Sequence, residues 1–240
     1  YQEARQYHDA VEVLDHFLVA HNTHPLTARI LFLRGYNYNL LNEPILARAD
    51  MDQFIADFPK HGLVLDAYFW RALTFFAERN YQSTLEALEQ LKDRVNGHRL
   101  EPEVAYRKAA TLYAKKDYTS ALLTIQNYLK TYPMHSKIEE GRVLLGDIQM
   151  GRGELSEARK IFASISPQAG HLFTYALFQT GKILRSLAGA EDRIESRASV
   201  LNIHREHFER YISRDDIPLQ RKGRMSEALY WIGWTYIEEG

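Results

Sequence analysis

Apolar positions recur along this chain with two superimposed periods. From Tyr118 onward, apolar side chains occupy positions i, i+3, i+4, i+7, i+10 and i+11, which is the single apolar stripe of an amphipathic α-helix. The same stripe returns every 37 residues without an inserted or deleted residue. Its five copies begin at Tyr7, Pro44, Tyr81, Tyr118 and Leu155. This long period predicts a helical repeat protein.

A second helix is predicted before each stripe, carrying a small residue where two helices would touch. The small residues are Gly35, Ala72, Ala109 and Gly146. Three residues after each of them stand Tyr38, Phe75, Leu112 and, in the fourth copy, Gln149. Asn42, Asn80 and Asp117 separate the two helices of a repeat as helix-capping residues do, whereas Pro59 and Pro133 end the second helix.

These residues resemble the tetratricopeptide repeat (TPR) family. The matching pattern is a small residue, a bulky apolar residue, a small residue, an aromatic residue and a proline. It is carried by Gly35, Tyr38, Ala47, Phe54 and Pro59, and again by Ala109, Leu112, Ala121, Tyr128 and Pro133. The usual unit has about 34 residues, and such lengthened units are similar to those of bacterial cell-envelope proteins, including outer-membrane assembly lipoproteins and periplasmic coordinators of cell division. The resemblance implies an all-α fold, an α-α superhelix built as a right-handed solenoid of antiparallel helix pairs.

One feature departs from the family pattern. Arg34, Arg71 and Lys108 precede the small residues, where the family usually has leucine. Two interpretations stay open: the aliphatic stems pack while the charged heads reach solvent, or the helices are locally rotated.

The regular repeats are predicted to span residues 1–170, the first one incomplete. Residues 171–213 read as an irregular helix pair with a long second helix, and residues 214–240 as a loop and the first helix of a truncated further repeat. Trp231, Trp234 and Ile237 would then be partly bare, although terminal repeats need a polar outer face. We therefore expect the natural chain to continue, and self-association through the Trp231/Trp234 end is a further expectation.

Four histidines share the repeat period, at His24, His61, His98 and His135. Neighbouring repeats lie on the order of 10 Å apart and zinc needs ligand nitrogens at about 2 Å, so these side chains cannot share one ion. They are expected to be polar loop residues that hydrogen-bond a helix terminus, with a series of weak anion or metal contacts as the alternative. His204 and His207 lie on one helix face, but without a third ligand at a recognised spacing they are expected on a solvated face. Neither a metal nor a cofactor is predicted.

Composition and motifs limit the classes of function that the chain can have. The net charge of −1 does not favour nucleic acid as a partner, and no apolar run is long enough to span a membrane. The absence of cysteine excludes disulfides, thiolate metal sites and a cysteine nucleophile. No phosphate-binding glycine loop and no nucleophile elbow occurs, so no enzymatic activity is predicted.

In this family the first helix of each repeat lines a concave groove that holds extended partners. The predicted partner-binding residues are Arg29, Phe32, Tyr36, Asn39, Asp66, Phe69, Leu73, Phe76, Glu103, Tyr106, Tyr113 and Asp147. The six aromatic residues among them suit a peptide-binding surface, because they supply contact area with few rotatable bonds. The alternative is that several of them fill the core between repeats. Some family members capture carboxy-terminal tails with lysines and asparagines, but the corresponding places here carry aromatic residues, which favours an apolar, aromatic-bearing ligand.

Two functions follow. The first is a non-enzymatic scaffold that holds a peptide or protein in its groove within a bacterial envelope complex, its rigid repeats presenting a preorganised surface. The alternative is a non-catalytic superhelical segment of a larger enzyme, such as a cell-wall hydrolase. The periplasm or cell envelope is the expected location, with the cytoplasm as the alternative.

Overall fold

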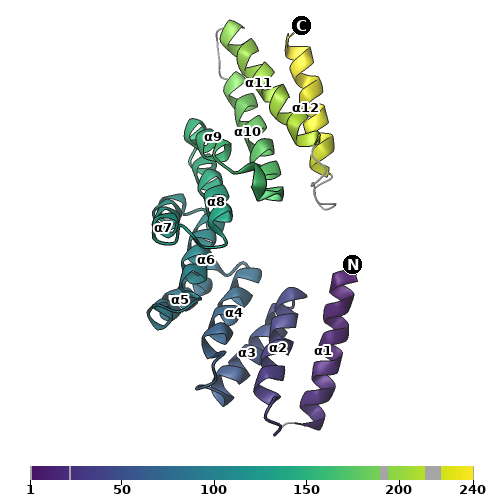
Figure 1. Cartoon of the computed structure of the whole chain (residues 1–240), viewed down its shortest axis with the longest axis vertical. Helices are drawn as coiled ribbons and strands as arrows, with labels where there is room; N and C mark the ends of the chain where they lie inside the picture. Colours follow the sequence, from purple (N-terminus) through teal and green to yellow (C-terminus); the bar gives the residue numbers. More distant parts are fainter. Residues whose placement is uncertain (1, 22, 190–193, 214–222, 240) are drawn as a thin grey trace. The chain divides into compact units, whose positions relative to one another are not determined.

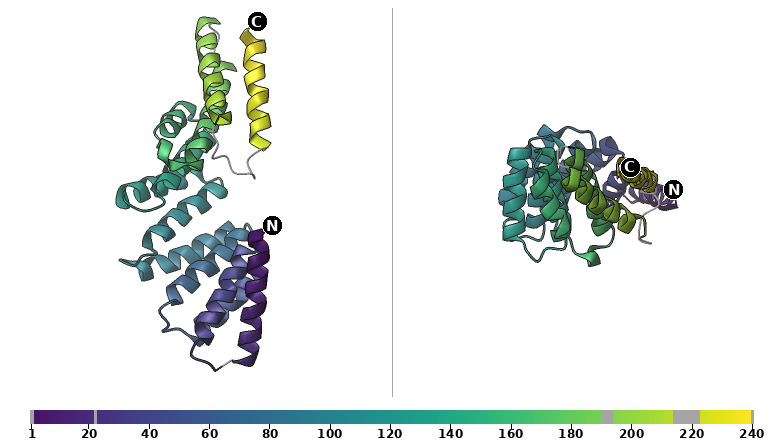
Figure 2. Two further views of the ribbon diagram at one scale, coloured as in Figure 1. Left: turned by 45° about the vertical axis from the view of Figure 1, so that its right-hand side comes forward. Right: turned by 90° about the horizontal axis from the view of Figure 1, so that it is seen from above.

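The computed structural model describes residues 2–21, 23–189, 194–213 and 223–239, and all regular secondary structure in these ranges is helical (Figure 1). The chain divides into two compact units, residues 1–117 and 118–240. Figure 2 shows the succession of helices within each unit from two other directions. The predicted all-α fold of consecutively packed helices is confirmed. The division at residues 170 and 213 stays a prediction.

Unit 1 consists of helices that pack on their neighbours in chain order. They are α1 (Gln2–Ala20), α2 (Thr27–Leu40), α3 (Pro44–Asp57), α4 (Val64–Ala77), α5 (Tyr81–Lys92), the short 3-10 helix η1 (Asp93–Val95) and α6 (Glu101–Ala114). In addition, α2 contacts α4, so the first helices of these two repeats lie side by side.

Unit 2 continues the alternation and then changes helix length. It contains α7 (Tyr118–Thr131), α8 (Ile138–Gly151), α9 (Leu155–Ala163), the 3-10 helix η2 (Pro167–Ala169), α10 (His171–Gly189), α11 (Ile194–Ile212) and α12 (Gly223–Glu239). Each helix packs on the next, and α8 also contacts α10.

The helix boundaries follow the 37-residue period. The first helices α2, α4, α6 and α8 start at residues 27, 64, 101 and 138, and each has 14 residues. The second helices α3, α5, α7 and α9 start at the predicted stripe positions Pro44, Tyr81, Tyr118 and Leu155. Within the stripes, Ala47, Thr84, Ala121 and Ala158 are all 0% exposed. The predicted repeat register is therefore confirmed.

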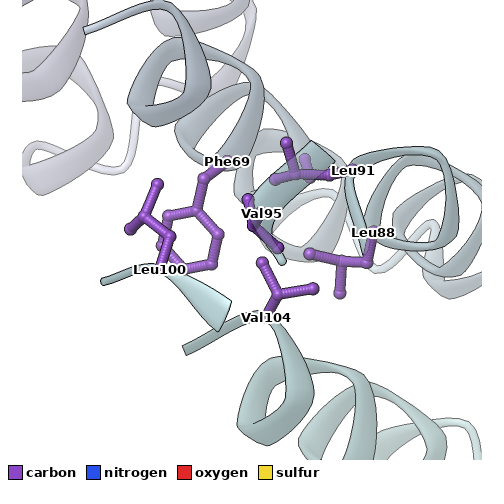
Figure 3. Close-up of a cluster of buried hydrophobic side chains, with 7 residues drawn as sticks. Phe69, Leu88, Leu91, Val95, Leu100 and Val104 are labelled. Atoms are coloured by element: carbon purple, nitrogen blue, oxygen red, sulfur yellow. The ribbon is translucent and has the colours of Figure 1, made fainter. Parts of the chain in front are cut away.

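Small residues are required where the first helix meets the second. A Cβ added at Gly35 would lie 2.9 Å from Asp50 Cβ, and one added at Gly146 would lie 2.7 Å from the ring of Phe162. Figure 3 shows one of the hydrophobic clusters of unit 1, where Phe69 of α4 packs with Leu88 and Leu91 of α5. The cluster is completed by Val95 of η1, Leu100 just before α6 and Val104 of α6.

The turns between paired helices also recur with the repeat. Asn42, Arg79, Lys116 and Gly153 all have positive φ, between 59° and 81°, and the next residue's N–H returns to a carbonyl five residues earlier, as from Glu43 to Tyr38 at 2.9 Å. This is the Schellman ending of a helix. Asn42 therefore ends α2, whereas the Asn80 side chain accepts from Ser83 N–H and caps α5 as predicted.

Candidate functional site

The four periodic histidines cap the first helices. The Nδ1 of His24, His61, His98 and His135 accepts a hydrogen bond from the backbone N–H two residues later, at 3.1, 3.1, 3.2 and 3.4 Å. These N–H groups open α2, α4, α6 and α8, where a helix leaves its first donors unpaired. The expectation that the histidines bind a helix terminus is confirmed.

His207 is more buried than the solvated face predicted for it. It is half-buried on α11 and its Nδ1–H donates to the Ile203 carbonyl at 2.8 Å. Burial lowers the pKa of His207, and the nearby charges of Arg210 and Arg159 lower it further. The side chain of His204 lies outside the described residues. Within the described part of the chain, no group of three or more His, Asp or Glu side chains is arranged to hold a metal ion.

The predicted groove residues of unit 1 separate into an accessible group and a buried group, and the accessible group has eight members. Arg29 is exposed, and seven others are half-buried on α2, α4 and α6. We call these eight residues the first-helix face: Arg29, Tyr36, Asn39, Leu73, Phe76, Glu103, Tyr106 and Tyr113. Whether they bind a partner stays a prediction.

Phe32, Phe69 and Asp66 do not belong to an open face, and their placement there is corrected. Phe32 is 8% exposed and packs against Phe54 with ring centroids 5.7 Å apart. Phe69 is 4% exposed inside the cluster of Figure 3. Asp66 is buried and accepts a hydrogen bond from Arg99 Nη2 at 2.5 Å. For the two phenylalanines, the alternative that these rings fill the core between helices is the correct one.

A tryptophan that the sequence pattern did not single out joins the first-helix face. Trp70 of α4 is half-buried, and its ring meets Tyr36 of α2 edge-on with centroids 4.8 Å apart. The pair bridges the first helices of two successive repeats. Phe76 is anchored in a similar way on Tyr81, at 5.6 Å. Two of the four aromatic side chains of the first-helix face, Tyr36 and Phe76, are thus held in place by ring contacts.

In unit 2, Asp147 takes part in a polar network instead. Its Oδ1 accepts from the Tyr175 hydroxyl at 2.8 Å, and that hydroxyl accepts from Gln179 Nε2 at 2.5 Å. The three side chains connect α8 with α10. Asp147 is half-buried.

The charged residues in the leucine positions form inter-repeat ion pairs. Arg34 pairs with Asp15 at 2.6 Å, Arg71 with Asp52 at 3.0 Å, and Lys108 with Glu89. The three acids are themselves spaced by 37 residues on α1, α3 and α5. Each cation therefore contacts the second helix of the preceding repeat, and the helices are not rotated out of register.

Arg34 has a second partner that makes its pair the most buried of the three. Its Nε and Nη2 donate to the two oxygens of Asp50 at 2.8 and 2.6 Å, and the Asp50 side chain is only 6% exposed. These hydrogen bonds raise the pKa of Arg34. Burial raises the pKa of the Asp50 carboxyl, against the opposing effect of Arg34. In the third pair, the hydrogen bond from Lys108 lowers the pKa of Glu89.

The two tryptophans of α12 are partly exposed, as expected. Trp231 and Trp234 are half-buried, with the Arg185 guanidinium 3.3 and 5.6 Å from their ring centroids. Among the side chains of this helix that the structure describes, the exposed large apolar ones are Leu229, Tyr230, Tyr236 and Ile237. Self-association through this end stays a prediction. None of the described helices combines the length and apolar content needed to cross a membrane.

Comparison with known proteins identifies the fold. Residues 76–165 match the family model described as YfiO, outer membrane lipoprotein, whereas no curated protein matches in sequence. The C-terminal part of a TPR repeat-containing protein from Cytophaga hutchinsonii is similar in structure, with a TM-score of 0.67 and 12% identity over 97% of this chain and 83% of that one.

Two further solved structures agree with this result. MamA from Desulfovibrio magneticus RS-1, from residue 41 to its end, gives a TM-score of 0.58 at 15% identity over 78% of this chain and 97% of that one. YrrB, described as a TPR protein with an unusual peptide-binding site, gives 0.54 at 16% identity over 82% of this chain and 93% of that one. At such low identity these similarities establish the fold alone. The chain is a TPR-like helical repeat protein.

Proposed function

We propose that the chain is a non-enzymatic scaffold that binds a peptide or protein partner on the first-helix face of unit 1. The observation that supports this most directly is the row of half-buried aromatic side chains on α2, α4 and α6, including the Tyr36–Trp70 pair. Such rings provide contact area while losing little rotamer freedom on binding. Arg29 and Glu103 on the same face supply charges that would orient the partner.

The arrangement is suited to binding because it is already ordered. Tyr36 is held by Trp70 and Phe76 by Tyr81, so a partner would not have to immobilise them, which lowers the entropic cost of association. The structurally similar YrrB, described as having a peptide-binding site, supports a peptide or an extended segment of a protein as the ligand. The match of residues 76–165 to an outer membrane lipoprotein family supports the bacterial envelope as the location.

Site-specific photo-crosslinking tests this proposal. A benzoylphenylalanine placed at Tyr36, Tyr106 or Tyr113 conserves much of the aromatic bulk, so folding should be maintained. After irradiation of bacterial envelope fractions, crosslinks to one and the same partner are expected from all three positions. Ile45 on the second helix α3 is 68% exposed and serves as the matched control.

The comparison of crosslinking from Ile45 with crosslinking from the three tyrosines decides between the two outcomes. Equal crosslinking from Ile45 and from the three tyrosines would contradict the first-helix face as the binding surface. Crosslinks from the tyrosines alone, competed by the unlabelled protein, would support it.

A further inference from the structure

Unit 1 contains two pockets that are related by the repeat. The first, of about 170 Å³, is lined in part by Leu31, Arg34, Gln53 and Asp57. The second, of about 280 Å³, is lined in part by Tyr68, Arg71, Gln90 and Arg94. Each residue of the second set follows its counterpart in the first by 37 positions. The two pockets are therefore the same place in successive repeats.

Both pockets lie on the side of the first helices away from the first-helix face. Arg71 is two residues before Leu73, and at 100° per residue this separates the two side chains by about 200° around α4. The other walls come from the second helices, through Gln53 and Asp57 of α3 and through Gln90 of α5 with Arg94 of η1. These pockets are thus separate from the proposed peptide surface.

The two pockets carry opposite charge. In the first, Arg34 is matched by Asp15 and Asp50, and Asp57 adds a third carboxylate. In the second, Arg71 has the single partner Asp52, and Arg94 adds a second cation. Arg94 has no ion pair among the residues that the structure describes. One unmatched positive charge therefore remains in the second pocket.

The Arg94 guanidinium of the second pocket has a ring contact that positions it before any ligand arrives. The Arg94 guanidinium lies over the Tyr68 ring, 4.1 Å from its centroid. The next residue, Val95, is 0% exposed and packs in the cluster of Figure 3, which fixes the backbone at Arg94. Arg71 Nε–H is buried and makes no hydrogen bond, although an Asp52 oxygen lies 3.0 Å away.

We propose that the Tyr68/Arg71/Gln90/Arg94 pocket binds a carboxylate on a short aliphatic stem, as in the side chain of an Asp or Glu residue of a bound protein. A planar guanidinium is suited to two parallel hydrogen bonds with a carboxylate, and the Gln90 amide offers a further donor. One unmatched charge suits a carboxylate better than a doubly charged phosphate. The Tyr68 ring, Ala87 and Leu91 provide an apolar wall for the stem.

The test is a titration of the full chain followed by NMR of arginine and glutamine side-chain N–H groups. The probes are N-acetyl-glutamate N-methylamide, its glutamine analogue and inorganic phosphate. Saturable shifts of Arg71, Gln90 and Arg94 are expected with the glutamate probe alone, in the millimolar range. Arg34 and Gln53 in the first pocket serve as an internal control and should not shift, because Asp57 repels a carboxylate.

Two variants distinguish binding by the pocket arginine from a general effect of the net charge of the protein. Arg94→Gln should weaken glutamate binding about tenfold by removing the charge-assisted bonds. Lys92→Gln removes an equal charge from an exposed side chain outside the pocket and should leave binding within about twofold. Absence of saturable shifts, equal binding of phosphate or of the glutamine probe, or equal effects of the two variants would overturn the proposal. None of these outcomes depends on the partner of the first-helix face.

Discussion

Units 1 and 2 use the same repeat but stabilise the contacts between helices in different ways. In unit 1, Arg34, Arg71 and Lys108 each form an ion pair with the second helix of the preceding repeat. One period later these positions are Leu145 and Gln126, between which no ion pair can form. In unit 2, Phe162 packs against Gly146 and Phe208 against Gly181.

The difference shows which parts of the repeat are essential. The small residues and the helix starts are kept from α2 to α9, whereas the charged position accepts leucine. After α9, the helices become longer, with 19 residues each in α10 and α11. A glycine, Gly181, still packs against an aromatic ring, that of Phe208. Close packing at the small residue thus maintains the fold, and the ion pairs are an addition to it.

Removing the cation of the most buried ion pair in unit 1 should destabilise the protein more than any other change considered below. Arg34→Leu leaves the Asp50 carboxylate buried without its cation, which should lower the free energy of unfolding by about 3 kcal/mol. The equivalent Lys108→Leu removes a pair in which Glu89 is half exposed and should cost less than about 1 kcal/mol. Urea denaturation measures both losses, together with hydrogen exchange of α2 and α3 for the first variant and of α5 and α6 for the second. Equal losses would show that burial of Asp50 is not what distinguishes the pairs.

An intermediate effect is expected at the glycine–ring contact of unit 2. Gly146→Ala places a Cβ 2.7 Å from two carbons of the buried Phe162 ring, and overpacking of this kind should cost about 1–2 kcal/mol. Gly233→Ala on α12 meets no atom within 4 Å and should instead stabilise by up to about 1 kcal/mol through helix propensity. Thermal unfolding of the two variants measures this difference in sign. Destabilisation by both would argue against a specific contact at Gly146.

The smallest effect is a pH dependence confined to unit 2. Because burial lowers the pKa of His207 in the folded state, the unfolded chain binds the proton more readily. Stability from this group is fully present above the ordinary histidine pKa of about 6.5 and is lost as the pH falls through the window below it. His207→Gln should flatten the change in unfolding midpoint across this window. An unchanged slope in the variant would assign the pH dependence to other groups.

Much of the fold and only part of the candidate site could be predicted from the sequence. The helix starts, the small-residue contacts and the capping histidines follow from local patterns, and all agree with the structure. The exposure of individual aromatic rings does not follow from such local patterns. Phe32 and Tyr36 lie one turn apart on α2, yet Phe32 is buried against Phe54 while Tyr36 meets Trp70. Which ring is covered depends on side chains from other helices.

The repeat period, the helices and the places where they touch can all be derived from the order of the residues, because each is specified by residues close together in the chain. Other properties are set by packing between helices: Phe32, Phe69 and Asp66 are buried, and cations in leucine positions meet acids 19 residues earlier. Packing also brings acidic side chains together at one pocket and basic side chains at the equivalent pocket of the next repeat. These properties depend on distances between side chains of different helices, which a helical period leaves open.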